Sequence, residues 1–334
     1  MAKVKLAIDF DCAVTNIYRV GAGVVLSEPT VAAIETDKDE VKFIGNDAKK
    51  LIGKTAKNTK IVFPVFEGEI VNEKVASGLL AGFCNKIEAK NGLFDSNTAL
   101  FSVPCGTTSE TLTVYRKVAN DAGINKVYFA EAPLLSALGQ RLIFSESTPC
   151  FVIDMAGGVT NIAALSLDGI IAGISVNFGY SGINAALIDY IADNFGIQIG
   201  LQSADRLRKN LVSLEENDGL SSVVSGRNVD TGKPMALSLK AYELTEPIKK
   251  YYDKIAEIAM EVLKKLPAEV SAEIKRSGIY VSGGGSSVYG LENYYTEKFG
   301  MKVTVAEHGL MSVALGGGVA MSDDSILKKI ILDF

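Results

Sequence analysis

Short runs of apolar, β-branched residues alternate along the chain with longer stretches in which apolar positions recur at helical spacing. In the first half this pattern predicts strands near residues 4–8, 24–35, 41–44, 98–103 and 126–130, and helices near 73–89, 107–122 and onward from Pro133. In the second half it predicts strands near 150–154, 160–167, 170–177, 278–282 and 302–305, and helices near 181–194, 241–265 and 289–299. Mixed strands and helices in each half predict an α/β protein with two sheets, each flanked by helices.

A ten-residue repeat supports this division into halves. Residues 8–17 (IDFDCAVTNI) and 153–162 (IDMAGGVTNI) are identical at six of ten positions and lie 145 residues apart. Each copy follows an apolar run and is predicted to form a strand, a tight turn and a second strand. We therefore expect two duplicated domains: residues 1–146, joined by C-terminal helices in 309–334 and carrying a small subdomain near 30–95, and residues 147–308. A cleft between two such domains is where a ligand usually binds.

Composition and charge narrow the class of protein. The chain has 334 residues, of which 48% are hydrophobic, and its net charge of −5 is spread without a basic block. Nucleic-acid binding is not expected, because it needs clustered Lys and Arg to displace counterions from phosphates. Four scattered cysteines and a single histidine argue against a zinc site. Every apolar run is shorter than the roughly 18–20 residues that span a bilayer, so we expect a cytoplasmic protein.

The turns of the repeat suit phosphate binding. In the second copy, Asp154 ends a strand and is followed by Gly157, Gly158 and Thr160. Glycines let the backbone approach a ligand closely, so that N–H groups converge on phosphate oxygens while the aspartate stays near the accompanying metal ion. The same geometry is expected around Asp9 in the first copy. A tight turn without a ligand is the alternative.

Two further glycine clusters follow. Gly283, Gly284 and Gly285 come directly after the strand near 278–282, where such a turn can lie flat against an adenine ring. A plain turn between a strand and a helix is the alternative there. Residues 316–318 (GGG) lie inside a helical pattern, where each glycine costs about 1 kcal/mol relative to alanine. Close helix packing explains this last cluster better than a ligand does.

Two aspartate-containing turns, a late glycine turn and a two-domain α/β plan resemble the superfamily of actin, heat-shock ATPases and sugar kinases. Within it, the chain is similar to the MreB family of bacterial actins over about residues 5–320. The resemblance implies an actin-like, ribonuclease H-like fold, ATP with Mg²⁺ in the cleft, and assembly into membrane-associated filaments that guide wall synthesis and cell shape. The stretches that carry it are VVLSEPTV at 24–31, GNDAK at 45–49, GEIV at 68–71, EAP at 131–133, GRN at 226–228 and the turn at 283–285.

The resemblance also assigns roles to particular residues. It implies that Asp9 and Asp154 bind the metal and that Glu131 positions an attacking water in a slow ATPase; for Glu131, an acid favoured by the dipole at a helix start is the alternative. Asp205 and Arg208 would lie near the ribose, with a simple surface pair as the alternative. The residues implied to contact the nucleotide are Asp9, Asp11, Thr15, Asn16, Asp154, Gly157, Gly158, Val159, Thr160, Asp205, Arg208, Gly283, Gly284 and Gly285.

The first turn departs from the family pattern. It reads DFDCAVT where the family has DLGTANT, so that Asp11 replaces a glycine and Cys12 a hydroxyl side chain. A carboxylate about 4 Å from a phosphate costs on the order of 4 kcal/mol at an effective dielectric constant of about 20, roughly a thousandfold in affinity, unless Mg²⁺ bridges the two or the side chain turns away. In the second turn, Ala156 replaces a glycine and Val159 a threonine. A scaffold that binds nucleotide weakly or not at all is therefore an alternative.

Partner surfaces are expected from the same resemblance. It implies self-association into filaments, contact with membrane-bound cell-shape proteins, and a location at the inner face of the cell membrane. Leu93 and Phe94 would insert into the membrane or, alternatively, fold back on the small subdomain. A small-molecule kinase or a chaperone-type ATPase fits less well, because the catalytic aspartate and the substrate domain that they need are not recognised. The apolar stripe expected to dock on the first domain consists of Ile326, Leu327, Ile330, Ile331 and Phe334.

Overall fold

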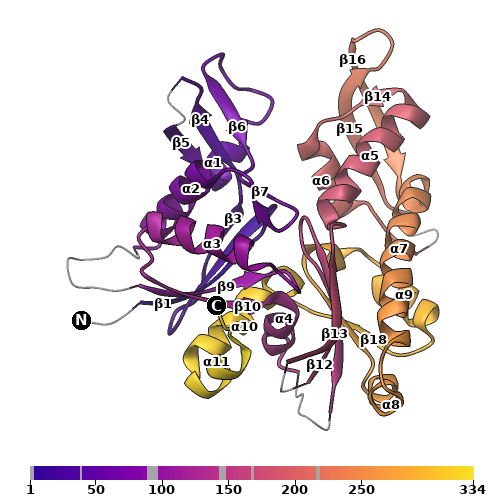
Figure 1. Ribbon diagram of the computed structural model, residues 1–334. Coiled ribbons are helices and arrows are strands. Elements are labelled where there is room, and N and C mark those ends of the chain that lie inside the picture. Colours follow the sequence, from indigo (N-terminus) through magenta and orange to yellow (C-terminus); the bar gives the residue numbers. More distant parts are fainter. Residues whose placement is uncertain (1–3, 38–39, 89–96, 143–147, 167–168, 216–218) are drawn as a thin grey trace.

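Two five-stranded sheets form the centres of the two lobes of the molecule (Figure 1). The computed structural model describes residues 4–37, 40–88, 97–142, 148–166, 169–215 and 219–334. The first sheet has the order β10 (Lys126–Glu131), β9 (Thr98–Val103), β1 (Lys5–Phe10), β2 (Val14–Arg19) and β3 (Gly23–Pro29). The second has the order β18 (Val303–Val305), β17 (Ile279–Ser282), β11 (Cys150–Met155), β12 (Thr160–Ser166) and β13 (Gly169–Val176).

The two sheets share one topology, which confirms the duplication predicted from the repeat. In the first, β1 pairs antiparallel with β2 and parallel with β9. In the second, β11 pairs antiparallel with β12 and parallel with β17. The register agrees as well, because Asp9 lies opposite Asn16 and Asp154 lies opposite Asn161. The repeated residues therefore occupy equivalent positions in two copies of one hairpin.

Helices cover both sheets and fill the space between them (Figure 1). Their first turns carry polar caps in several cases; Asn72, for example, accepts a hydrogen bond from the backbone N–H of Val75 at the start of α2. The first lobe contains α1 (Gly45–Lys49), α2 (Glu73–Lys86), α3 (Ser109–Asp121) and α4 (Ala132–Gly139). The second contains α5 (Tyr180–Phe195), α6 (Leu201–Asn210), α7 (Thr245–Lys264), α8 (Ala268–Ser277) and α9 (Leu291–Phe299), and the chain ends with α10 (Ser312–Ser322) and α11 (Asp324–Ile330).

A three-stranded sheet extends each lobe, at the top of the view in Figure 1. The small sheets are β5 (Glu40–Ile44), β4 (Ala32–Glu35) and β6 (Thr59–Val62); β14 (Ile197–Gln198), β15 (Ser221–Asn228) and β16 (Pro234–Lys240); and the pair β7 (Val65–Phe66) and β8 (Glu69–Ile70). The hydrophobic pattern did not predict the three-stranded sheet of the second lobe, which consists of β14, β15 and β16. It did not predict helices α6 and α8 either. In β15 and β16, exposed residues alternate with buried or partly buried ones. The sequence of β15 (SSVVSGRN) is mostly polar, so its pattern is weak. In β16, Met235, Leu237 and Leu239 face the core, and the prediction missed this alternation.

Three large hydrophobic clusters hold the molecule together. One lies within each lobe, and the third contains residues from both large sheets together with α4 and α10. In this shared cluster, Ala7 and Leu100 of the first sheet join Val152 and Ala163 of the second. The two sheets are thus fixed to one another below the cleft by apolar burial.

The C-terminal segment docks on the first lobe, as its apolar stripe predicted. Leu327 and Ile330 are buried in the shared cluster. Beyond α11, Ile331 forms a bridge with Ala130 of the edge strand β10. The ring of Phe334 then lies against that of Phe129, with 6.3 Å between centroids.

Helices α4 and α10 approach so closely that glycine is required at their contact. A methyl group built on Gly316 would overlap the carbonyl oxygen of Leu135, and one built on Gly139 would overlap that of Ser312. Both neighbours are backbone atoms, which cannot turn aside. Close packing is therefore the reason for this glycine cluster, as the sequence indicated.

We predict that Gly316→Ala lowers the free energy of unfolding by about 3 kcal/mol or more, because it forces two helix backbones apart. Gly182→Ala in α5 is the matched control: its added methyl lies 3.4 Å from the nearest atom, on Tyr251. That variant should be unchanged or up to about 1 kcal/mol more stable. Urea denaturation measures both. Equal effects of the two substitutions would contradict the packing explanation.

Candidate functional site

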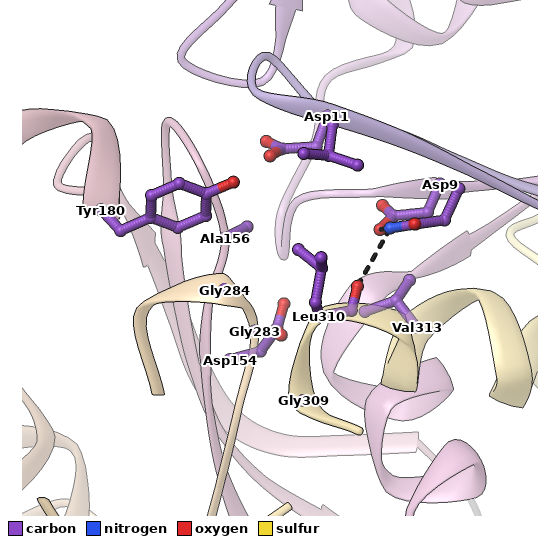
Figure 2. A pocket seen from close by; sticks show the side chains of 12 residues that line it. Asp9, Asp11, Asp154, Ala156, Tyr180, Gly283, Gly284, Gly309, Leu310 and Val313 are labelled. Carbon is purple, nitrogen blue, oxygen red and sulfur yellow. Dashed lines mark hydrogen bonds between the residues drawn. The ribbon is translucent and has the colours of Figure 1, made fainter. Parts of the chain in front are cut away.

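The two hairpins of the duplication face one another across the floor of the cleft. Figure 2 shows Asp9, Asp11 and Asp154 directed into one small space, with the ring of Tyr180 at its side. This cavity has a volume of about 10 Å³ and is bounded below by Gly283 and its neighbours. It has room for about one water molecule.

A chain of hydrogen bonds fixes the aspartate of the first hairpin. The hydroxyl of Ser102, near the end of β9, donates to Asp9 Oδ1 at 2.8 Å. The side-chain amide of Asn16 donates to Asp9 Oδ2 at 3.5 Å, and Ser27 on β3 donates to Asn16 Oδ1 at 2.7 Å. Asp9 is therefore held from the strands on either side of β1.

The second hairpin repeats this chain residue for residue. Ser282, at the end of β17, donates to Asp154 Oδ1 at 3.0 Å, and Asn161 donates to Asp154 Oδ2 at 3.1 Å. Ser175 on β13 in turn donates to Asn161 Oδ1. Each half thus has the sequence serine, aspartate, asparagine, serine across four neighbouring strands. Asp154 and Asn161 are each 1% exposed, so these bonds replace solvent.

Burial and mutual repulsion make the carboxylates hard to ionise. Burial, then the charge of Asp11, raise the pKa of Asp9 to about 8 despite the hydrogen bond from Ser102. Burial also raises the pKa of Asp154 to about 6, against the hydrogen bonds from Asn161 and Ser282. At neutral pH this crevice therefore holds a proton on Asp9 for most of the time.

Asp11 reaches from the first turn to the backbone of the second. Its Oδ2 accepts hydrogen bonds from the N–H of Gly157 at 2.8 Å and of Ala13 at 3.4 Å. Burial raises the pKa of Asp11, and the N–H groups of Gly157, Cys12, Ala13 and Gly158 oppose that shift. The N–H groups that the sequence predicted for phosphate oxygens thus face a carboxylate of the chain itself.

The second turn is anchored on the first residues of α5. The N–H groups of Tyr180 and Ser181 donate to the carbonyls of Ala156 and Gly157 at 3.0 and 2.9 Å. Directly before them, Gly179 lies so close to the turn that a side chain there would overlap Gly157 O. The turn is therefore rigidly placed.

The glycine turn predicted to face adenine is held by side chains from two helices. Tyr252 of α7 donates to Gly285 O at 2.6 Å, and Arg208 of α6 donates to Gly284 O at 3.2 Å. The guanidinium carbon of Arg208 also lies 4.4 Å from the centre of the Tyr180 ring. Arg208 thus fills the space between α6 and the glycine turn.

Asp205 and Arg208 form the ion pair that their spacing predicted, at 3.1 Å. Asp205 also pairs with Lys209 at 3.0 Å and, across the cleft, with Lys49 at 3.3 Å. The alternative of a simple surface pair is wrong for Arg208, whose side chain is only 5% exposed. Within the described residues its Nε is buried and has no hydrogen-bond partner.

Glu131 lies at the start of α4, next to the loop that follows β9. Its Oε1 accepts a hydrogen bond from the N–H of Gly106 at 2.8 Å, and it makes no side-chain cap to its own helix. The carboxylate and the Cys105 thiol are neighbours, since burial and then Glu131 raise the pKa of that thiol to about 12. In this conformation Glu131 is a tether for the loop.

A larger cavity of about 510 Å³ lies above the two turns, between the part of the first lobe near β7 and helices α5 and α6 of the second lobe. Its floor is formed by Cys12, Ala13, Gly157 and Gly158, and Asp205 stands at one side. Its walls are mainly apolar and include Phe63, Phe66, Phe178 and Leu201. The volume suits a small-molecule ligand.

The structure brings most of the predicted site residues to these two cavities. Five of those implied to contact the nucleotide line neither cavity: Thr15, Val159, Thr160, Arg208 and Gly285. Thr15 and Thr160 are fully buried, and their hydroxyls are engaged by Thr30 and by Phe178 O. We therefore no longer assign those two hydroxyls a direct ligand contact. The predicted residues that line the smaller cavity are Asp9, Asp11, Asn16, Asp154, Gly283 and Gly284, and those lining the larger one are Gly157, Gly158 and Asp205.

Sequence reasoning missed Ser102, Ser282 and Tyr180. The two serines end strands that lie next to β1 and β11, so extending the repeat to those strands would have paired them. Tyr180 carried no such signal, because its position depends on how α5 meets the second turn. Leu93 and Phe94, predicted for the membrane, lie outside the described residues.

Among the described residues, no group of three or more His, Cys, Asp or Glu side chains is arranged to hold a metal ion. Over the same ranges, no helix is both long and apolar enough to cross a bilayer.

Solved structures with the same architecture identify the fold class. MreB5 of Spiroplasma citri bound to ADP is 24% identical, covers 98% of each chain and superposes with a TM-score of 0.90. MamK in a double helical filament is 18% identical, covers 96% of this chain and 99% of its own, and gives a TM-score of 0.79. The fold and the facing hairpins are those of an actin-like protein with two duplicated domains.

Sequence comparisons identify the family. The profile of the MreB/Mbl protein family matches residues 3–329. The cell shape-determining protein MreB of Escherichia coli K12 is 33% identical over 321 residues, which cover 95% of this chain and 92% of that one. Mbl of Bacillus subtilis 168 is 28% identical over 325 residues, covering 97% of both chains. The chain belongs to the MreB/Mbl family.

The raised pKa values predict a pH-dependent stability. Asp9 keeps its proton to about pH 8 in the folded state but loses it near pH 4 when unfolded, so wild-type stability falls as pH rises across that window. Asp9→Asn removes this titration. We expect the variant's advantage over wild type to grow by about 1.4 kcal/mol per pH unit from about pH 4 to 8 and then level off.

Urea denaturation at several pH values measures this difference. Asp193→Asn, which removes an exposed carboxylate from α5, is the control and should show no such trend. A constant difference between Asp9→Asn and wild type from pH 4 to 8 would mean that Asp9 ionises normally in the folded protein.

Proposed function

We propose that this protein assembles into filaments that take part in determining cell shape. The observation that carries the proposal is the match to the MreB/Mbl family over residues 3–329, in a chain with the duplicated actin-like fold. A filament of the similar protein MamK has the same fold. Self-association of copies of this chain is therefore the first activity to test.

We further propose that the interdomain cleft is a site for an adenine nucleotide. The relative MreB5 has been solved with ADP and with AMPPNP. In this chain the larger cavity would admit the nucleotide, Asp205 would lie near the ribose, and the turn at Gly283 to Gly285 would face the base. Mg²⁺ would take Asp9 or Asp154 with phosphate and water oxygens, as this ion usually does.

The residues do not fit a bound nucleotide in the conformation described. The N–H of Gly157 is taken by Asp11, the carbonyl of Gly284 by Arg208, and the crevice between the turns holds about one water. Asp11 would have to move before a phosphate oxygen could accept from the Gly157 N–H. We therefore derive no hydrolytic step, and Glu131 as the residue that positions water stays a prediction.

A filament scaffold that binds nucleotide weakly is the second candidate. The observation in its favour is the position of the Asp11 carboxylate. It accepts the hydrogen bond from Gly157 N–H that a phosphate oxygen would accept. The two candidates differ only in whether assembly requires nucleotide. We place either one in the cytoplasm at the inner face of the cell membrane, with Leu93 and Phe94 as candidate membrane contacts and membrane-bound cell-shape proteins as candidate partners.

We predict that the purified chain pellets at high speed as filaments that are visible by negative-stain electron microscopy. The assay compares protein alone, protein with Mg²⁺-ATP, and each of these with anionic lipid vesicles. The scaffold candidate predicts the same polymer yield with and without nucleotide, and the ATP-driven candidate predicts polymer only with it. Failure to pellet under all four conditions would contradict the proposed function.

A further inference from the structure

The carboxylate of Asp11 makes the contacts that a bound anion would make. It accepts hydrogen bonds from the N–H of Gly157, on the opposite lobe, at 2.8 Å and from Ala13, on its own turn, at 3.4 Å. The N–H groups of Cys12 and Gly158 also act on it. Converging backbone N–H groups are the usual means by which tight turns bind anions.

The two turns are in contact around this carboxylate. A side chain on Gly157 would overlap Asp11 Oδ2, and a methyl group on Gly158 would lie 2.9 Å from Cys12 Sγ. Ala13 packs against the hydrophobic core of the second lobe. Little space therefore remains between the turns for a further anion while Asp11 stays in place.

The surroundings would not attract a second anion. Among the described residues, the titratable side chains that line the crevice are all acidic, namely Asp9, Asp11 and Asp154. The nearby guanidinium of Arg208 is directed to Asp205 and to Gly284 O. A polyphosphate entering the crevice would meet carboxylates and would have to take N–H groups that are already bonded.

We propose that Asp11 is a tethered substitute for a bound phosphate: its carboxylate joins the two turns and must leave them before a polyphosphate can bind. This inference rests on the proposed function only in assigning the same cleft to nucleotide. Asp11 thereby sets the affinity of the cleft for phosphate groups. The closed arrangement of the turns is available to the protein without nucleotide.

The test is calorimetric titration of tripolyphosphate, and separately of Mg²⁺-ATP, into wild type, Asp11→Gly and Asp11→Asn at pH 7.5. We expect wild type to bind weakly and both variants to bind more tightly by on the order of a hundredfold, since one negative charge is removed in each. The hydrogen bonds that hold the N–H groups are lost in Asp11→Gly and weakened in Asp11→Asn. Asp11→Asn preserves the volume of the side chain, so it remains informative if Asp11→Gly does not fold.

Two controls separate release of the N–H groups from a general loss of negative charge. Asp154→Asn removes a carboxylate from the same crevice but leaves Asp11 on the turns, so it should raise the affinity much less than Asp11→Asn. Asp193→Asn, on the surface of α5, should leave the affinity unchanged.

Micromolar binding of tripolyphosphate by wild type would overturn the proposal, as would folded Asp11 variants that bind no more tightly than wild type. An equal gain from Asp154→Asn would also overturn it, because simple repulsion would then suffice. If neither Asp11 variant folds, the wild-type affinity alone decides. These titrations use unassembled protein, so their outcome is independent of whether the chain pellets as filaments.

Discussion

Three aspartate carboxylates have to be accommodated at the junction of the two large sheets, and much of the local structure serves that constraint. Asp9 and Asp154 are each fixed by a serine and an asparagine from neighbouring strands. Asp11 is satisfied by the backbone of both turns. Buried charges are tolerated only with such partners, so the hairpins, their flanking strands and the start of α5 are held in one arrangement.

The same bonds connect the two halves of the molecule. Below the cleft the halves share a hydrophobic cluster with α4 and α10, where glycines bring the helices together. Above it, two polar contacts join the lobes, Asp11 to Gly157 and Lys49 to Asp205 at 3.3 Å, and Ala13 packs against the core of the second lobe. An apolar base with polar contacts above is suited to opening at the cleft while the base remains intact.

The features of the fold and the site that depend on local sequence were predictable, and those that depend on contacts between distant elements were not. The repeat gave the duplicated hairpins and the equivalent positions of Asp9 and Asp154, because strand, turn and register are local properties. The packing role of Gly316 followed from its helical context. Other features depend on contacts between elements that are distant in the sequence. They are the direction of the Asp11 side chain, the burial of Arg208 and the position of Tyr180. The sheet β14 to β16 was missed because β14 has only two residues and β15 is mostly polar, although β16 alternates exposed and core-facing residues.

In nucleotide-free protein, Asp11 occupies the N–H groups of the second turn. Amide hydrogen exchange at Gly157 and Gly158, followed by NMR in nucleotide-free protein, tests it directly. We predict slow exchange at Gly157 in wild type and exchange faster by on the order of tenfold or more in Asp11→Asn, since that hydrogen bond is charge-assisted. Fast exchange at Gly157 in wild type, or the same slow rate in both proteins, would contradict the account.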